Sequence, residues 1–269
     1  MRALPRLLST DYRLLFLWSE TLSQTYDFAN ILFAGPCNLR CLYCIGKQVD
    51  PALNRNNLDE FPPRSLDTFV TLLRAHHVRQ VVLTGTTTDP QLYRYEARLI
   101  RWLREQMPEA RLSLHTNGQL ALEKIDVVNL YDRVSLSLPS FEPDIYEKMT
   151  GSRRVPDLRA ILRAARVPVK VSCVIDEHNA GQVDVFLARC REIGVRRVVL
   201  RQLYGDHRRW DLLSHRSPVR TYRDNPVYDC DGIEVTWWDF GRTVSTSLNL
   251  FSDGTISGEY LLAKARTGG

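Results

Sequence analysis

Short apolar runs alternate with segments of helical periodicity from residue 28 onward, and the alternation repeats six times. This order of elements is typical of βα units that build a parallel sheet. The predicted strands cover residues 30–34, 80–84, 111–115, 133–138, 169–174 and 197–201.

The two clearest helices in the pattern are 66–73 and 183–193, where apolar residues recur at i, i+3, i+4 and i+7. The strand 133–138 instead alternates the small polar residues Ser135 and Ser137 with apolar ones. Such alternation suits a strand whose inner face lines a partly open barrel, and we expect ligands on that face.

The chain changes character after residue 204. Two strand-like runs, 233–240 and 243–251, are joined at Gly241, and Asp253-Gly254 predicts a second hairpin turn. We therefore divide the chain into an N-terminal extension (1–27), a barrel (28–204) and a small β-rich appendage (205–269).

Size and composition leave an ordinary globular protein. With 269 residues, 44% hydrophobic and 25% charged, a stable core needs no disulfides. No apolar run approaches the roughly 18 residues that a membrane span requires, and no secretory leader is evident. We expect a cytoplasmic protein with no membrane partner, whose six cysteines are reduced thiols.

Positive charge is concentrated in one segment. Residues 196–223 hold eight arginines and two aspartates, a net charge of +6 in a chain whose total is +5. This segment begins at the sixth predicted strand, so we expect it to lie over the barrel mouth and to favour an anionic group. A solvated arginine-rich loop is the plainer alternative.

Three cysteines directly follow the first predicted strand. Cys37, Cys41 and Cys44 have the spacing C-x3-C-x2-C, and the other three cysteines are scattered. Structural zinc takes four tetrahedral ligands, whereas three close thiolates suit a four-iron cluster with one iron left open.

The cysteine loop after the first strand, with Tyr43 just before the last cysteine, resembles the radical SAM superfamily over roughly residues 28–204. The core looks like that of the molybdenum-cofactor cyclases and SPASM enzymes. The resemblance implies an α/β fold, a partial (β/α)6 barrel holding a [4Fe-4S] cluster and S-adenosylmethionine (SAM). It also implies reductive cleavage of SAM to a 5′-deoxyadenosyl radical, which abstracts hydrogen from a substrate.

Further positions match the family motif one by one. After the second strand, Gly85-Thr86-Thr87-Thr88-Asp89-Pro90 stands where the family has Gly-Gly-Glu-Pro, with two extra residues. Asn117 lies in a Thr-Asn-Gly turn like that of the family. The resemblance assigns cofactor contacts to Tyr43, Gly85, Thr86 and Asn117, although the threonines also suit a plain turn.

On the fourth strand, the resemblance favours Ser137 as a SAM contact, and Arg153 or Arg154 could bind the methionine carboxylate through a guanidinium fork. A backbone-bonded serine and a surface arginine are the alternatives. Of Ser172 and Cys173, at most one faces the ligand.

Three remaining residues have plainer interpretations. Asn179 is placed to cap a helix that begins at Ala180. Cys190 falls on an apolar helical stripe and should be core. Cys230 lies between two aspartates, which should raise its thiol pKa.

The β-rich appendage resembles the C-terminal hairpin of SPASM or twitch extensions, but with Cys230 as its one cysteine it predicts no auxiliary cluster and leaves a substrate-covering lid. The leading hypothesis is an enzyme with an anionic small-molecule or peptide substrate and an electron donor such as flavodoxin or ferredoxin. The catalytic residues stay open. A non-catalytic cluster protein that senses redox state or binds nucleic acid, and a zinc-stabilised binding module, are the alternatives.

Overall fold

The computed structural model describes residues 25–206 and 208–260, so nearly all of the expected N-terminal extension and the end of the appendage lie outside the described residues. All six predicted parallel strands are present. They are β1 (Phe28–Phe33), β2 (Gln80–Gly85), β3 (Arg111–Thr116), β4 (Arg133–Ser137), β5 (Val169–Ile175) and β6 (Arg197–Gln202).

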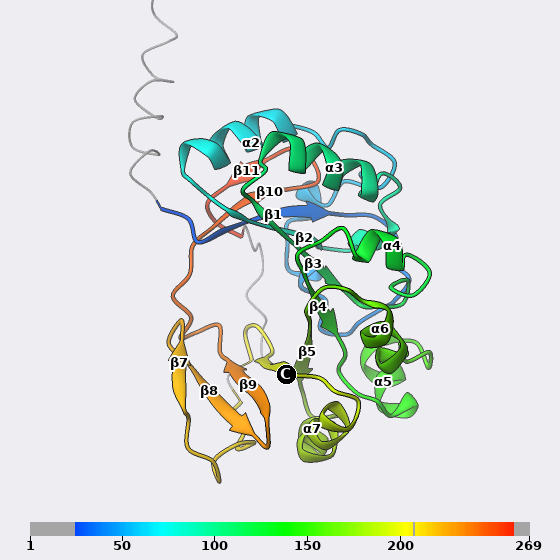
Figure 1. Cartoon of the computed structure of the whole chain (residues 1–269), viewed down its shortest axis with the longest axis vertical. Coiled ribbons are helices and arrows are strands. Elements are labelled where there is room, and N and C mark those ends of the chain that lie inside the picture. Colours follow the sequence, from blue (N-terminus) through cyan, green and yellow to red (C-terminus); the bar gives the residue numbers. More distant parts are fainter. Residues whose placement is uncertain (1–24, 207, 261–269) are drawn as a thin grey trace, which may run out of the picture.

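The helices follow the strands along the outer face of the curved sheet (Figure 1). They are α2 (Leu66–Ala75), α3 (Glu96–Gln106), α4 (Ile125–Val128), α5 (Pro143–Thr150), α6 (Leu158–Ala164) and α7 (Val183–Glu192). Short 3-10 turns occupy Ile45–Lys47, Pro51–Leu53, Pro90–Leu92 and Ala180–Gln182. The apolar spacing explains both helices that it predicted, because Leu66, Phe69, Val70 and Leu73 are the buried residues of α2.

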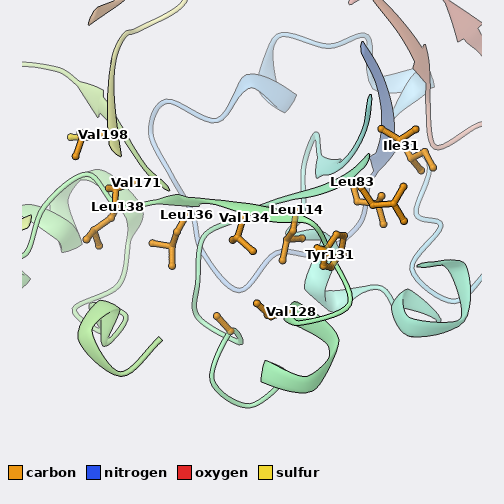
Figure 2. Packing of buried hydrophobic residues seen from close by; sticks show 14 of the residues in the cluster. Ile31, Leu83, Leu114, Val128, Tyr131, Val134, Leu136, Leu138, Val171 and Val198 are labelled. Carbon is orange, nitrogen blue, oxygen red and sulfur yellow. The ribbon is translucent and has the colours of Figure 1, made fainter. Parts of the chain in front are cut away.

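The core lies between the outer face of the sheet and these helices. Figure 2 shows Leu114, Val134, Leu136 and Val171 on that face, and all four are fully or almost fully buried. The intervening Ser135 points to the opposite face, as a strand's period of two requires. Small polar residues are thereby left along the inside of the barrel.

Five more strands extend the sheet at both edges. They are β7 (Arg220–Tyr222), β8 (Asn225–Cys230), β9 (Ile233–Trp238), β10 (Ser247–Leu250) and β11 (Ile256–Ser257). The strand order of this eleven-stranded sheet in the described chain is β11-β10-β1-β2-β3-β4-β5-β6-β9-β8-β7.

The predicted hairpin at Gly241 is wrong. β9 pairs in parallel with β6, whereas β10 pairs in parallel with β1 at the other edge of the sheet. The link between them crosses the open side of the barrel (Figure 1). The apolar pattern of two consecutive runs does not show that each run pairs with a different edge of the sheet. The second predicted turn is confirmed, because Asp253-Gly254 joins β10 and β11 as an antiparallel pair.

The fold class is therefore confirmed: an α/β partial barrel with a parallel core, to which the C-terminal region adds β-strands. No described helix is long and apolar enough to cross a membrane.

Candidate functional site

The carboxyl ends of β1 to β4 and the loops after them line one end of a cavity of about 1310 Å³. Such ends are where parallel barrels place their ligands, because the loops converge there. Cys37, Cys41 and Cys44 all face this cavity. All six cysteines of the chain are free thiols.

The three cysteine sulfur atoms do not all lie within 4.8 Å of one another. Only Asp176, Glu177 and His178 form a group of three metal-binding side chains within 4.8 Å of one another in the described chain. A tetrahedral zinc ion would bring thiolates to about 3.8 Å, given Zn–S bonds of about 2.3 Å. A separation above 4.8 Å for at least one pair suits the larger [4Fe-4S] cluster better than a mononuclear zinc site.

Burial is the main cause that raises the pKa of the Cys37 and Cys41 thiols. Burial and then the neighbouring Cys44 and Cys37 raise the pKa of Cys41 to about 12. The Leu39 backbone N–H donates to the Cys37 sulfur at 3.5 Å, an interaction that tunes cluster sulfurs in proteins. Cluster iron would reverse this tendency, because a coordinating thiol is deprotonated outright.

The C-terminal hairpin packs behind the cysteine loop. Phe251 is buried with Leu32 and Val49, and Tyr260 packs against this small cluster. The Ser252 hydroxyl donates to the Leu53 carbonyl oxygen at 2.7 Å. The segment after Cys44 is therefore held by residues about 200 positions away in the chain.

The segment 85–90 meets the cysteine loop through backbone contacts. The Cys44 sulfur lies 3.3 Å from the Thr86 carbonyl oxygen, and the Thr86 hydroxyl donates to Asn54 Oδ1 at 2.6 Å. A Cβ added to Gly85 would stand 1.7 Å from the Thr88 carbonyl oxygen. The sharp turn thus requires glycine at position 85, the physical reason for that part of the motif.

Asp89 ties the two motif turns together. Its buried carboxylate accepts hydrogen bonds from the Asn117 backbone N–H at 2.6 Å and from the Thr116 hydroxyl at 2.9 Å. Burial raises the pKa of Asp89, against the hydrogen bonds that stabilise its charged form. The sequence had given Asp89 no role, yet this side chain fixes where Asn117 lies.

The structure brings most of the predicted cofactor contacts together. Tyr43, Gly85, Thr86, Asn117 and Ser137 all line the cavity with the cysteines. The structure shows that these residues lie in one cavity, and their contact with a cofactor stays a prediction.

Arg153 is not part of this group. Its guanidinium is exposed and pairs with Asp144 at 2.7 Å and Glu147 at 2.9 Å, outside the residues that line the cavity. The position just after α5 turns the side chain back onto that helix. The surface interpretation of Arg153 is the one that the geometry favours.

Ser172, Cys173, Cys190 and Cys230 lie where the sequence predicted. Ser172 lines the cavity and Cys173 is buried in the core, as the strand period requires. Cys190 is fully buried in the same core. Burial raises the pKa of Cys230, with further contributions from Asp231 and Asp229 and an opposing one from Arg216.

The capping role of Asn179 is wrong. Its side chain makes no cap hydrogen bond at the turn Ala180–Gln182. Instead, its amide donates to the carbonyl oxygens of Pro139 at 2.9 Å and Val174 at 2.8 Å. Its Oδ1, the atom that would cap the turn, accepts from the Asp176 backbone N–H at 2.9 Å.

The arginine-rich segment is only partly at the cavity. Arg197, Arg201, Arg220 and Arg223 line it. Arg208 is instead paired with Asp206 and Glu177 at 2.7 Å each, outside the lining.

A family model described as the Radical SAM superfamily matches residues 31–184, more than half of the chain. The chain belongs to the radical SAM superfamily. Its cofactors are accordingly a [4Fe-4S] cluster and SAM, and the family indicates an enzyme. The donor set fits the cluster: three free thiols, not all within 4.8 Å of one another, line one cavity.

Several relatives of this radical SAM chain are named as cyclases. It is 25% identical over 223 residues to a probable GTP 3′,8-cyclase of Methanococcus aeolicus, covering 74% of this chain and 72% of the relative. It is 32% identical over 148 residues to a GTP 3′,8-cyclase of Streptomyces coelicolor, covering 52% and 42%. With a third relative, from Saccharolobus solfataricus, the match is 25% over 177 residues and spans 62% of this chain but 54% of that protein.

Solved structures show the same fold. SuiB of Streptococcus suis, crystallised with its precursor peptide SuiA, superposes with a TM-score of 0.52 at 15% identity, covering 76% of this chain and 47% of SuiB. SuiB bound to S-adenosylmethionine gives the same TM-score at 16% identity, covering 80% and 49%. The chain thus spans about half of the length of these structural neighbours.

Proposed function

We propose that this protein is a radical SAM enzyme that uses one [4Fe-4S] cluster to generate a radical and abstract hydrogen from an anionic small molecule or peptide. Cys37, Cys41 and Cys44 would hold the cluster, and the bound cluster and SAM would supply the one-electron reductive chemistry for hydrogen abstraction. The observation that carries the proposal is that the three cysteines and the motif residues Gly85, Asn117 and Ser137 line one cavity.

The chain's own residues would hold and orient the cofactors. Cys37, Cys41 and Cys44 would bind three irons and leave the fourth open to SAM. The 85–90 turn would bring backbone groups close to SAM, because Gly85 has no side chain to block the approach. Asp89 would act as a positioning residue through its hydrogen bond to the Asn117 backbone.

An anionic substrate is supported by the basic side chains inside the cavity. Arg197, Arg201, Arg220 and Arg223 from the arginine-rich segment line its wall. Aromatic side chains share that wall, with Trp238 and Phe240 6.4 Å apart between ring centroids. Charged and flat surfaces together make GTP, the substrate in the relatives' names, the first compound to test.

The C-terminal region would cover the substrate. Phe240, Thr243 and Ser245 lie on the link between β9 and β10 and line the cavity from the barrel's open side. We also propose a flavodoxin or ferredoxin as the electron donor and the cytoplasm as the compartment, because free thiols and a reducible cluster need reducing conditions.

Anaerobic reconstitution followed by reduction with dithionite tests the proposal. We expect 5′-deoxyadenosine and methionine from SAM, and faster release of both when the true substrate is present. GTP, a diphosphate nucleotide and a peptide would be compared. A reconstituted cluster that never cleaves SAM would overturn the proposed function in favour of a non-catalytic cluster protein.

A further inference from the structure

Three basic side chains project into the barrel cavity without a carboxylate partner. They are Arg133 on β4, Lys170 on β5 and Arg201 on β6, and all three line the cavity. Within the described residues, none of them has an acidic oxygen within 4.0 Å. Arg133 donates to Ser113 and Gln80 at 2.7 and 2.6 Å, and Arg201 donates to Ser172 at 2.8 Å.

Neighbouring cations of the same wall have carboxylate partners, and the single Glu234 carboxylate serves two of them. Glu234 accepts from Arg197 at 2.8 Å and from Arg220 at 2.7 Å. Arg223 lies 3.8 Å from Asp27. The basic groups of the wall therefore fall into two sets: those with a carboxylate partner, and Arg133, Lys170 and Arg201, which have none.

Confinement makes the unpaired charge costly. Burial, followed by Arg201 and Arg133, lowers the pKa of Lys170 to about 7. Burial alone lowers the pKa of Arg201 to about 10. The same surroundings hold the pKa of His115 well below its usual range, so His115 adds no charge at neutral pH. A buried charge without a partner is destabilising, and an anion with several oxygens would relieve the repulsion.

We propose that Arg133, Lys170 and Arg201 form an oxyanion pocket that binds a phosphate group of the substrate. This inference rests on the proposed function only because it identifies the bound anion as part of the substrate. Two guanidinium groups and one ammonium supply more donors than a single carboxylate can accept, and a phosphate matches them in charge and geometry.

The methionine carboxylate of SAM is the other possible source of an oxyanion. Position along the strands favours the substrate. Arg133 begins β4 and Lys170 is the second residue of β5, whereas Ser137 ends β4 beside the cysteine loop. Four residues of strand separate Arg133 from Ser137 by about 13 Å. Arg133 and Lys170 are therefore remote from the carboxyl end of β4. Arg201 is the fifth of the six residues of β6 and lies nearer that end, but its Nε reaches Ser172 Oγ at 2.8 Å, two residues along β5 from Lys170.

Binding of inorganic pyrophosphate to the reconstituted enzyme, measured by calorimetry with and without saturating SAM, tests this pocket. The variants are Lys170→Met and Arg201→Gln, and the matched control is Arg209→Gln, an exposed arginine of the same segment. Circular dichroism would show that each variant is folded. In every preparation, 5′-deoxyadenosine formation would be measured separately.

We expect pyrophosphate to bind the wild type with or without SAM, and each pocket variant to bind it at least about tenfold more weakly. Arg209→Gln should bind it as the wild type does. Equal affinity in all four proteins, or displacement of pyrophosphate by SAM, would overturn the proposal. Should Arg201→Gln fail to fold, Lys170→Met decides alone, because methionine fills the same space as the lysine stem.

Sulfate provides a second readout, since its charge does not change between pH 6 and 9. An anion must bind the protonated Lys170, so wild-type affinity should fall above pH 7 by up to about tenfold per pH unit. In Lys170→Met this decline should disappear. The charged and titratable groups around Lys170 that could contribute are Arg133, Arg197, Arg201, Arg223, His115, Tyr222 and Glu234.

The two proposals can fail independently. Pyrophosphate binding without SAM cleavage would keep the oxyanion pocket and remove the radical chemistry. SAM cleavage with pyrophosphate affinity unchanged by the variants would do the reverse.

Discussion

At the carboxyl ends of the strands the cavity wall consists of backbone, small side chains and thiols, whereas on the inner faces of β4 to β6 it carries unpaired cations. In the first region, the side chains of Asp89 and Thr86 form hydrogen bonds with other groups of the protein. In the second region, the ammonium of Lys170 has no hydrogen-bond acceptor among the described residues. One end is therefore internally satisfied and rigid, and the other holds charge that a ligand can satisfy.

The largest expected effect is loss of the cluster. Replacing any one of Cys37, Cys41 and Cys44 by alanine should reduce bound iron from about four atoms per chain to nearly none and abolish SAM cleavage. Iron analysis after anaerobic reconstitution measures this. Cys190→Ala is the control, because this buried thiol should keep its iron and cost only about 1 kcal/mol of stability. Eight irons per chain in the wild type would refute the single-cluster expectation.

Gly85→Ala tests whether the first region is as rigid as its contacts indicate. The new Cβ would stand 1.7 Å from the Thr88 carbonyl oxygen, so the turn must move. We expect a loss of about 2 to 4 kcal/mol in the free energy of unfolding and weaker SAM binding. In Gly181→Ala no atom lies within 4 Å of the new Cβ, so this variant should keep its stability and its SAM affinity. Similar denaturation midpoints for the two variants would contradict this account of the turn.

Stability against pH tests the second region. Because Lys170 has a pKa of about 7 in the folded chain and near 10.4 when unfolded, the unfolded chain binds more protons between these values. The contribution of Lys170 to stability should therefore increase by about 1.4 kcal/mol per pH unit from pH 7 toward 10. Below pH 7, the charged lysine is equally protonated in both states and its cost stays constant.

The measurement is the difference in urea unfolding between the wild type and Lys170→Met. At pH 7 the methionine variant should be the more stable protein, and the difference should shrink as pH rises. A difference that does not change with pH would mean that Lys170 keeps its ordinary pKa and that the inner wall is not electrostatically strained.

The smallest expected effect is that of Arg153→Gln. This exposed arginine pairs only with Asp144 and Glu147 of its own surface, and exposed ion pairs contribute little. SAM affinity and SAM cleavage should be unchanged, as measured by calorimetry and 5′-deoxyadenosine release. A clear loss of SAM binding would return Arg153 to the site and contradict the division of the cavity into these two regions.

The two regions also differ in how far the sequence could predict them. The cysteine spacing, Gly85 and Asn117 are local patterns of a few residues, and the structure places them around one cavity. Arg133, Lys170 and Arg201 lie on three strands and are 31 or more positions apart, so no short motif joins them. Inward alternation on β4 was visible in Ser135 and Ser137, and extending it by two residues would have included Arg133.

Local charge also misled the sequence interpretation. Arg208 belongs to the most basic segment, yet Asp206 and Glu177 bind it on the outside. The strand runs were predicted well because each carries its own apolar pattern. Their partners were not, because the pairing of β10 with β1 depends on contacts between residues 219 positions apart.

That pairing has a consequence for the order of events during synthesis and maturation. Buried Asn30 and Asn249 share a side-chain hydrogen bond of 2.7 Å, and the strand that carries Asn249 leads into the residues packed behind the cysteine loop. During synthesis, β1 cannot pair with β10 until nearly the whole chain has been made. We expect the cysteine loop to remain accessible to iron until late in folding, and the pairing of β10 with β1 to restrict that access.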